Sequence, residues 1–224
     1  MTSRSSLVAP VTPNSRNPRR GARRTHAARF VAGVPVGGRF PALAAPEVAF
    51  AGRSNVGKSS LINRLVGQRG LARVSKTPGR TQQINYFLID ERMVFADLPG
   101  YGFARVPLAV KAQWKELVET YLSTRRALRG VVVIVDIRRG LQDDDAQLLD
   151  FLTTLRLPVI LVATKGDKIT FGERQRRGAD LGALAAQRGA HLVVCSALTG
   201  EGLDAVWQAV EQACAAGAHG AATR

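Results

Sequence analysis

The chain has 224 residues and a marked excess of basic side chains, with 32 Lys and Arg against 17 Asp and Glu and a formal net charge of +15. This length can bury a full hydrophobic core, so a mini-protein held together by disulfides or metal ions is excluded. A disulfide framework and a membrane span are excluded too, because the chain has only Cys195 and Cys214 and no apolar run reaches the roughly 18 residues that a span needs.

The basic charge is concentrated at the N-terminus, where residues 1–46 hold eight Arg and no Asp or Glu. Such a polycation predicts a polyanionic partner, with nucleic acid favoured over membrane. The lack of acidic residues and the repeated prolines disfavour a packed segment before Glu47. We therefore expect a basic disordered tail over residues 1–28, with an organelle transit peptide as the alternative. We expect one domain over residues 29–214 and a flexible end over residues 215–224.

From Glu47 onward, short apolar runs alternate with stretches of helical periodicity. Six runs are typical of strands: EVAFAG, QINYFLID, MVFADLP, GVVVIVD, PVILVAT and HLVVC. The helices are expected at residues 58–67, about 108–128, 141–155, 172–188 and 202–214. The link between the second and third strands is so short that they must pair antiparallel. The pattern predicts a three-layer α/β domain, with helices on both faces of a mostly parallel sheet of about six strands, one of them antiparallel.

A glycine-containing loop joins the first of these strands to the first helix. Its sequence is Gly52-Arg53-Ser54-Asn55-Val56-Gly57-Lys58-Ser59, which fits the phosphate-loop pattern in its required context. The glycines let backbone N–H groups surround a β-phosphate, Lys58 reaches β- and γ-oxygens, and the Ser59 hydroxyl ligates Mg²⁺. The loop predicts binding of a nucleoside triphosphate and leaves ATP and GTP both open.

Two strings later in the chain favour guanine. Thr164-Lys165-Gly166-Asp167 follows a buried strand, at the edge where open α/β sheets hold ligands. The Asp167 carboxylate can accept both the ring N–H and the exocyclic amine of guanine, while the stem of Lys165 lies along the base. Ser196-Ala197-Leu198 follows the last strand and can direct backbone N–H groups at the guanine O6. Each string is weak alone, and their order after the phosphate loop makes them informative.

Two further segments are expected to respond to the γ-phosphate. Asp97-Leu98-Pro99-Gly100 ends a strand, so Asp97 can hold the Mg²⁺ shell and the Gly100 N–H can meet the γ-phosphate. Thr77-Pro78-Gly79-Arg80-Thr81 lies between the first helix and the second strand. Thr81 can ligate Mg²⁺ when triphosphate is bound and release it after hydrolysis, which defines a switch.

These five elements, in this order, resemble the Ras-like GTPases. The strings GRSNVGKSSLINRL, SKTPGRTQQINYF and DLPGYGFARVP are similar to the EngB (YihA/YsxC) family, within the TrmE-Era-EngA-EngB-septin group, over about residues 25–212. The resemblance implies a Mg²⁺-dependent GTPase of the bacterial cytoplasm that acts as a switch in assembly of the large (50S) ribosomal subunit. It also implies a role in cell division and septation. The partners to expect are GTP or GDP and the precursor of the large subunit, bound by a monomer.

The resemblance implies GTP contacts at five sets of motif residues, namely Gly52 to Ser59, Gly79 to Thr81, Asp97 to Gly100, Thr164 to Asp167 and Ser196 to Leu198. It places Mg²⁺ on Ser59, Thr81 and Asp97. The residues expected to act in hydrolysis are Lys58, Asn55, Gly100 and Thr81.

Three positions bear on the hydrolysis rate and on the base loop. Tyr101 stands where signalling G proteins carry the glutamine that orients water, so we expect slow intrinsic hydrolysis, below the range of about 1–100 s⁻¹ typical of kinases. The Asn55 amide could ligate a K⁺ ion that supplies the missing charge, or it could merely cap the loop. Thr164 replaces the usual Asn, which predicts a weaker link from the base loop to the phosphate loop.

Two other functions fit parts of the pattern. A nucleotide-sensing module of the division machinery, with negligible hydrolysis, would keep the same pocket. A P-loop ATPase or nucleotide kinase would not need Asp167.

Several other residues have structural explanations. Asp143, Asp144 and Asp145 are expected to complement a helix dipole rather than to bind metal. Trp114, Trp207 and Cys195 are expected in the core, and His26, His191 and His219 have no partner motif that would suggest a general base.

Overall fold

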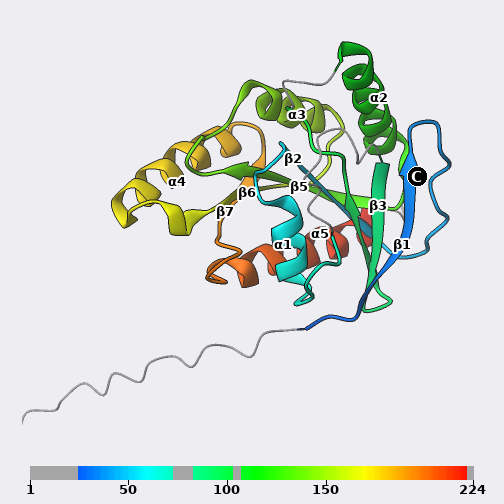
Figure 1. Cartoon of the computed structure of the whole chain (residues 1–224), viewed down its shortest axis with the longest axis horizontal. Coiled ribbons are helices and arrows are strands. Elements are labelled where there is room, and N and C mark those ends of the chain that lie inside the picture. Colours follow the sequence, from blue (N-terminus) through cyan, green and yellow to red (C-terminus); the bar gives the residue numbers. More distant parts are fainter. Residues whose placement is uncertain (1–24, 73–82, 103–106, 221–224) are drawn as a thin grey trace, which may run out of the picture.

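The computed structural model describes residues 25–72, 83–102 and 107–220. Within these residues a seven-stranded sheet has the order β1-β3-β4-β2-β5-β6-β7 and carries helices on both faces (Figure 1). The strands are β1 (Ala28–Pro35), β2 (Glu47–Gly52), β3 (Gln83–Ile89), β4 (Met93–Asp97), β5 (Leu128–Asp136), β6 (Val159–Thr164) and β7 (Ala190–Val194). The helices are α1 (Lys58–Leu65), α2 (Leu108–Thr124), α3 (Asp143–Thr154), α4 (Phe171–Ala186) and α5 (Leu203–Gly220), with a short 3₁₀ helix η1 (Gly166–Lys168). The predicted three-layer α/β fold is confirmed.

The central strands are apolar because both of their faces are covered. Every residue of β2 is buried, and successive side chains point to opposite faces of the sheet. Val48 and Phe50 pack with α1 and α5, whereas Ala49 and Ala51 pack with α2, α3 and α4. The two hydrophobic layers hold the parallel strands so that their carboxyl ends meet at one edge.

The predicted antiparallel pairing is also present. β3 pairs antiparallel with β4, and Ile89 lies opposite Met93. In the turn between them Asp90 and Glu91 both have positive φ, and the Arg92 N–H donates to the Ile89 carbonyl at 3.0 Å. This is the arrangement of a type I′ hairpin, whose twist matches that of the flanking strands. β3 is the strand that runs against the others, because it is also antiparallel to β1.

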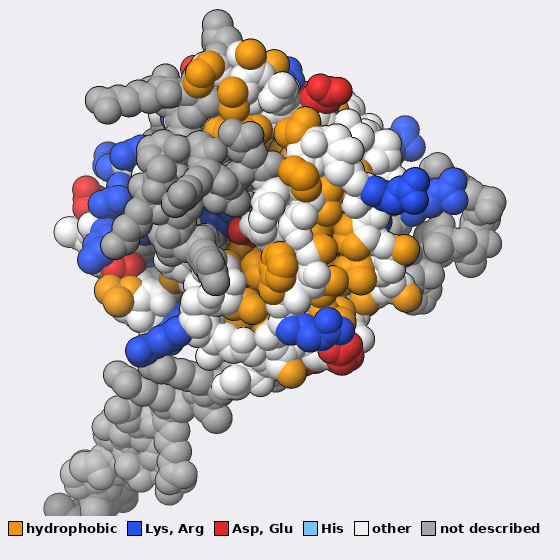
Figure 2. Space-filling view, turned by 45° about the vertical axis from the view of Figure 1, so that its right-hand side comes forward, with side chains coloured by type: hydrophobic (Ala, Val, Ile, Leu, Met, Phe, Trp, Pro, Cys, Tyr) orange, Lys and Arg blue, Asp and Glu red, His pale blue; other side chains and the backbone are white. Residues whose placement is uncertain are grey.

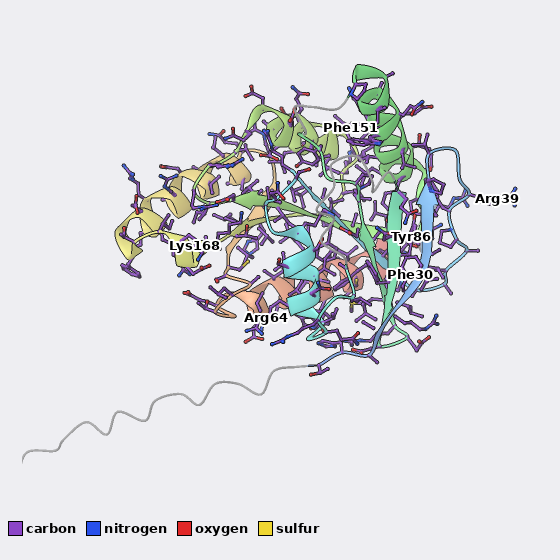
Figure 3. All side chains as sticks on the ribbon, in the orientation of Figure 1. Phe30, Arg39, Arg64, Tyr86, Phe151 and Lys168 are labelled. Atoms are coloured by element: carbon purple, nitrogen blue, oxygen red, sulfur yellow. The ribbon has the colours of Figure 1, made fainter. Side chains whose placement is uncertain are left out.

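The composition of residues 1–46 disfavoured a packed segment there, but β1 is part of the sheet. This strand pairs with β3 along its whole length, which gives the sheet seven strands instead of six. Pro35 is its last residue, and an edge strand tolerates proline because one side of it makes no ladder hydrogen bonds. The rings of Phe30 and Phe87 meet edge to face at 5.9 Å, and Figure 3 labels Phe30 on β1. Phe30 remains 53% exposed, and Figure 2 shows hydrophobic side chains on this side of the molecule.

The packed chain begins before β1, within the segment assigned above to the tail. His26 is 8% exposed, its ring stacks on Trp207 of α5 at 4.0 Å, and its Nδ1 lies 2.6 Å from Asp90 Oδ2. At the other end of the chain, α5 continues to Gly220, so the first part of the end expected to be flexible from residue 215 is helical. The alanines in that stretch have the highest helix propensity of any residue.

The core residues expected from the sequence are confirmed. Trp114, Trp207 and Cys195 are all buried. Across the described ranges, no helix combines the length and the hydropathy needed to cross a bilayer.

Candidate nucleotide-binding site

The phosphate loop begins where β2 ends and leads into α1. A side chain at Gly52 would place its Cβ 2.8 Å from the carbonyl oxygen of Ile134, so the close approach of β2 to β5 requires glycine. Gly57 has a φ of +106° and Asn55 a φ of +66°, which lets the chain turn sharply before the helix. The N–H groups of the first turn of a helix have no partner within the helix and carry positive potential. The loop is therefore shaped to surround an anion.

Lys58 and Asp97 meet at this loop. β2 and β4 are parallel neighbours in which Phe50 lies opposite Asp97, so the end of β4 sits beside the start of the loop. The Lys58 ammonium donates to the Asp97 carboxylate, and both side chains are largely buried, 12% and 7% exposed. The structure thus brings together two residues that the sequence placed in one site from different motifs.

The loop after β6 is fastened to the phosphate loop by two side chains. The Thr164 hydroxyl lies 2.6 Å from the Val56 carbonyl oxygen, and the Lys165 ammonium donates to the Asn55 carbonyl oxygen at 2.7 Å. The link that the Thr164 replacement was expected to weaken is present, and Lys165 adds a second bond that the sequence did not suggest. The base loop and the phosphate loop are therefore held in a fixed relation.

Asp136, the last residue of β5, was missed in the sequence. Its carboxylate is 3% exposed and accepts hydrogen bonds from Lys165 Nζ at 2.9 Å and from Arg138 Nε and Nη2 at 3.0 and 2.7 Å. Burial opposes ionisation, but the hydrogen bonds from Arg138 and Lys165 outweigh it and hold the pKa of Asp136 well below its usual range. The ionised carboxylate fixes the Lys165 stem. The sequence signal that could have indicated Asp136 is an acidic residue at the end of an apolar strand.

The two guanine strings also lie together. The Ser196 hydroxyl donates to Asp167 Oδ1 at 2.6 Å and accepts from the Thr199 N–H at 3.1 Å. The Gly166 N–H donates to the Cys195 carbonyl at 3.2 Å, which joins the two loops through the backbone as well. The Ser196 hydrogen bond lowers the pKa of Asp167, so this carboxyl stays an acceptor. The side-chain role of Ser196 was not expected from the sequence.

The residue after the Asp97–Gly100 string makes two different contacts. The Tyr101 carbonyl accepts from the Ser54 N–H at 2.9 Å, and its phenol donates to Asp145 Oδ1 at 2.8 Å. Asp145 lies in the first turn of α3 and also accepts from the Gln142 N–H at 3.0 Å, completing a capping box. The helix-start interpretation of the three consecutive aspartates is confirmed. Within the described ranges, no group of three or more His, Cys, Asp or Glu could hold a metal ion.

Part of the expected site, namely Gly79, Arg80 and Thr81, lies outside the described residues. Of the expected Mg²⁺ ligands, Ser59 lies in the first turn of α1 and Asp97 faces Lys58 next to it. Mg²⁺ prefers oxygen ligands and usually takes one or two from protein, completing its shell with water and substrate phosphates. A hydroxyl and a carboxylate beside a phosphate loop fit such an ion.

Comparison with known proteins agrees with this geometry. Residues 47–165 match the protein family described as 50S ribosome-binding GTPase. The probable GTP-binding protein EngB of Citrifermentans bemidjiense is 48% identical over 182 residues, which cover 81% of this chain and 85% of that protein. The corresponding protein of Geobacter metallireducens is 49% identical over 190 residues, covering 85% and 93%.

Two solved structures are similar in fold. The crystal structure of a probable GTP-binding protein EngB matches with a TM-score of 0.62 and 26% identity, over 75% of this chain and 98% of that one. Era in complex with MgGDPNP and nucleotides 1506–1542 of 16S ribosomal RNA matches with a TM-score of 0.60 and 25% identity, over 74% and 55%. From the sequence identity, the family match and the arrangement of the phosphate and base loops, the chain belongs to the EngB family of GTP-binding proteins.

Proposed function

We propose that this chain is a Mg²⁺-dependent GTPase that acts as a switch in assembly of the large ribosomal subunit. The observation that carries the GTP assignment is Asp167, a carboxylate kept ionised by Ser196 in a loop fastened to the phosphate loop by Thr164 and Lys165. That carboxylate can accept the N–H pair of guanine, which adenine does not offer. The ribosomal partner is supported by the family description, by Era bound to ribosomal RNA and by the net charge of +15.

Each group has a role in this proposal. Lys58 and the N–H groups of the phosphate loop bind the β- and γ-phosphates, and the Gly100 N–H meets the γ-phosphate. Ser59, Thr81 and Asp97 would hold Mg²⁺, which when bound supplies positive charge to the phosphate oxygens. The Lys58 ammonium that would bind the phosphates also donates to the Asp97 carboxylate. This bond orients Lys58 before the nucleotide binds.

Hydrolysis is proposed to be slow without a partner or a cation. Tyr101 has no amide with which to orient water, and its phenol is directed at Asp145. The backbone carbonyl of Asn55 accepts a hydrogen bond from Lys165. The side-chain amide of Asn55 is therefore the group that would ligate K⁺. Equal GTPase rates in KCl and NaCl would rule out that cation role.

The base assignment is tested with Asp167→Asn. An amide presents a donor to the guanine N1–H, so we expect the preference to move from GTP toward xanthosine triphosphate, measured as the affinities for both nucleotides. Asp143→Asn is the matched control, since Asp143 is an exposed aspartate at the start of α3 and its substitution should leave both affinities unchanged. Retained GTP preference in Asp167→Asn would defeat the assignment.

The ribosomal role is tested in cells by depleting the protein and sedimenting ribosomal particles. We expect precursors of the large subunit to accumulate, together with filamentous cells if division and septation depend on the same activity. An unaltered large-subunit profile combined with a septation defect would favour a nucleotide sensor of the division machinery. Cytoplasmic location and a monomeric state belong to the same proposal, and sedimentation of the purified chain tests the latter.

A further inference from the structure

Tyr101 lies at a junction of three elements. Its carbonyl accepts from both the N–H and the hydroxyl of Ser54 in the phosphate loop, at 2.9 and 3.3 Å. Its backbone also forms a parallel bridge with that of Arg53. Its phenol reaches Asp145 at the start of α3. One residue thus joins the segment after β4 to the phosphate loop on one side and to a helix on the other.

The acceptor of the phenol is fixed in place. Asp145 is 1% exposed, and its second oxygen accepts from the Gln142 N–H, so the carboxylate cannot turn without breaking the helix cap. Burial and the nearby Asp145 raise the pKa of Tyr101 well above its ordinary value. The phenol therefore stays protonated and can donate.

The residue before Tyr101, Gly100, also lies close to the phosphate loop. A Cβ at Gly100 would lie 3.1 Å from Ser54 Oγ, so the Gly100 backbone rests against the phosphate loop. A second contact between the loop and α3 lies alongside, where Arg53 Nη1 is 3.7 Å from Asp144 Oδ2. The direction of the Gly100 N–H therefore depends on how the next residue is anchored.

We infer that Tyr101 is a positioning residue for GTP hydrolysis, whose bond to Asp145 fixes the Gly100 N–H against the phosphate loop. This inference rests on the proposed GTPase function. An N–H that is aimed at charge developing in the transition state lowers the barrier without tightening ground-state binding. Loss of the anchor therefore reduces kcat and leaves nucleotide affinity nearly unchanged.

The test is Tyr101→Phe, which removes only the hydroxyl. We expect kcat to fall about tenfold, as for a modest misplacement of a stabilising group, with the KM for GTP and the affinity for GDP within about twofold of wild type. The matched control is Tyr121→Phe. The hydroxyl of Tyr121 also donates to a carboxylate, that of Glu47 at 3.1 Å, but Tyr121 is fully buried in the core between α2 and the sheet, whereas Tyr101 is partly buried. Loss of the Tyr121 hydroxyl should lower the stability of the protein and leave kcat unchanged.

A second variant keeps the inference testable if Tyr101→Phe folds poorly. Asp145→Ala removes the acceptor and should lower kcat to a similar extent. The double variant should show no further fall in kcat, because both changes remove the same Tyr101–Asp145 bond, while the Gln142–Asp145 bond that Asp145→Ala also removes belongs to the helix cap. Unchanged kcat in Tyr101→Phe, equal loss in Tyr121→Phe, or additive losses in the double variant would each overturn the role. Absence of GTP turnover in the wild-type protein would instead defeat the proposed function, before any variant is compared.

Discussion

At the scale of single residues, the pocket depends on hydrogen bonds that hold carboxylates ionised. The Ser196 bond lowers the pKa of Asp167, so the guanine acceptor is present above that depressed value and is lost only as pH falls through it. In Ser196→Ala the pKa of Asp167 rises toward its ordinary value, and guanine binding should be lost at a higher pH than in wild type. Affinity for GDP measured from about pH 7 down to about pH 4 checks this, because that interval spans the ordinary titration of a carboxyl group. Ser123→Ala on α2, far from the base loops, is the control, and identical pH profiles for wild type and Ser196→Ala would contradict the prediction.

At the scale of elements, a buried ion pair joins β2 to the end of α2. Glu47 is fully buried, and Arg125, which follows α2, donates to both of its oxygens, one of them from Nε at 2.8 Å. This carboxylate bond raises the pKa of Arg125, so the guanidinium is charged throughout the working pH range. Arg125→Met should lower the free energy of unfolding by about 3 kcal/mol, since removal of one partner leaves an uncompensated buried charge. Urea unfolding checks it against Arg126→Met, an exposed neighbour expected to change stability by less than about 0.5 kcal/mol.

The strands differ in how well the sequence predicts them. β2 and β6 were predictable because strands covered on both faces are continuous apolar runs. β1 was missed because only Val34 in it is buried, and its place depends on backbone hydrogen bonds to β3, which leave no side-chain pattern.

The residues of the site also differ in how well the sequence predicts them. The phosphate loop and the base strings are local sequence patterns, and the structure brings them together. The contacts of Lys165 with Asp136 and of Tyr101 with Asp145 join residues from separate elements. Asp136 lies next to Lys165 because β5 and β6 pair with Asp136 opposite Thr164, and Asp145 reaches Tyr101 because α3 packs on the sheet, so no local pattern matches either residue with its partner.

At the scale of the whole molecule, part of the net charge of +15 lies in residues 1–24, which precede the described fold, and part lies within that fold. Residues 1–24 hold six Arg and no acidic residue, whereas His26 is already packed against α5. Deletion of residues 1–24 should therefore weaken association with ribosomal RNA at low salt and reduce the salt dependence of binding, by a slope of about 0.7 to 0.9 for each phosphate that the shortened chain no longer neutralises. Its affinity for GTP should not change.

A longer deletion, of residues 1–28, also removes His26 with its bond to Asp90 and the first residue of β1. We expect the two deletions to reduce RNA affinity equally, because residues 25–28 contain no Lys or Arg. Only the longer one should lose stability, through the stacking of His26 on Trp207 and the edge pairing of β1. Filter binding across a salt series and thermal unfolding of both deletions separate the two effects. Loss of GTP binding in the shorter deletion would mean that the arginine-rich segment is part of the nucleotide site, and the division of the charge into two parts would then be wrong.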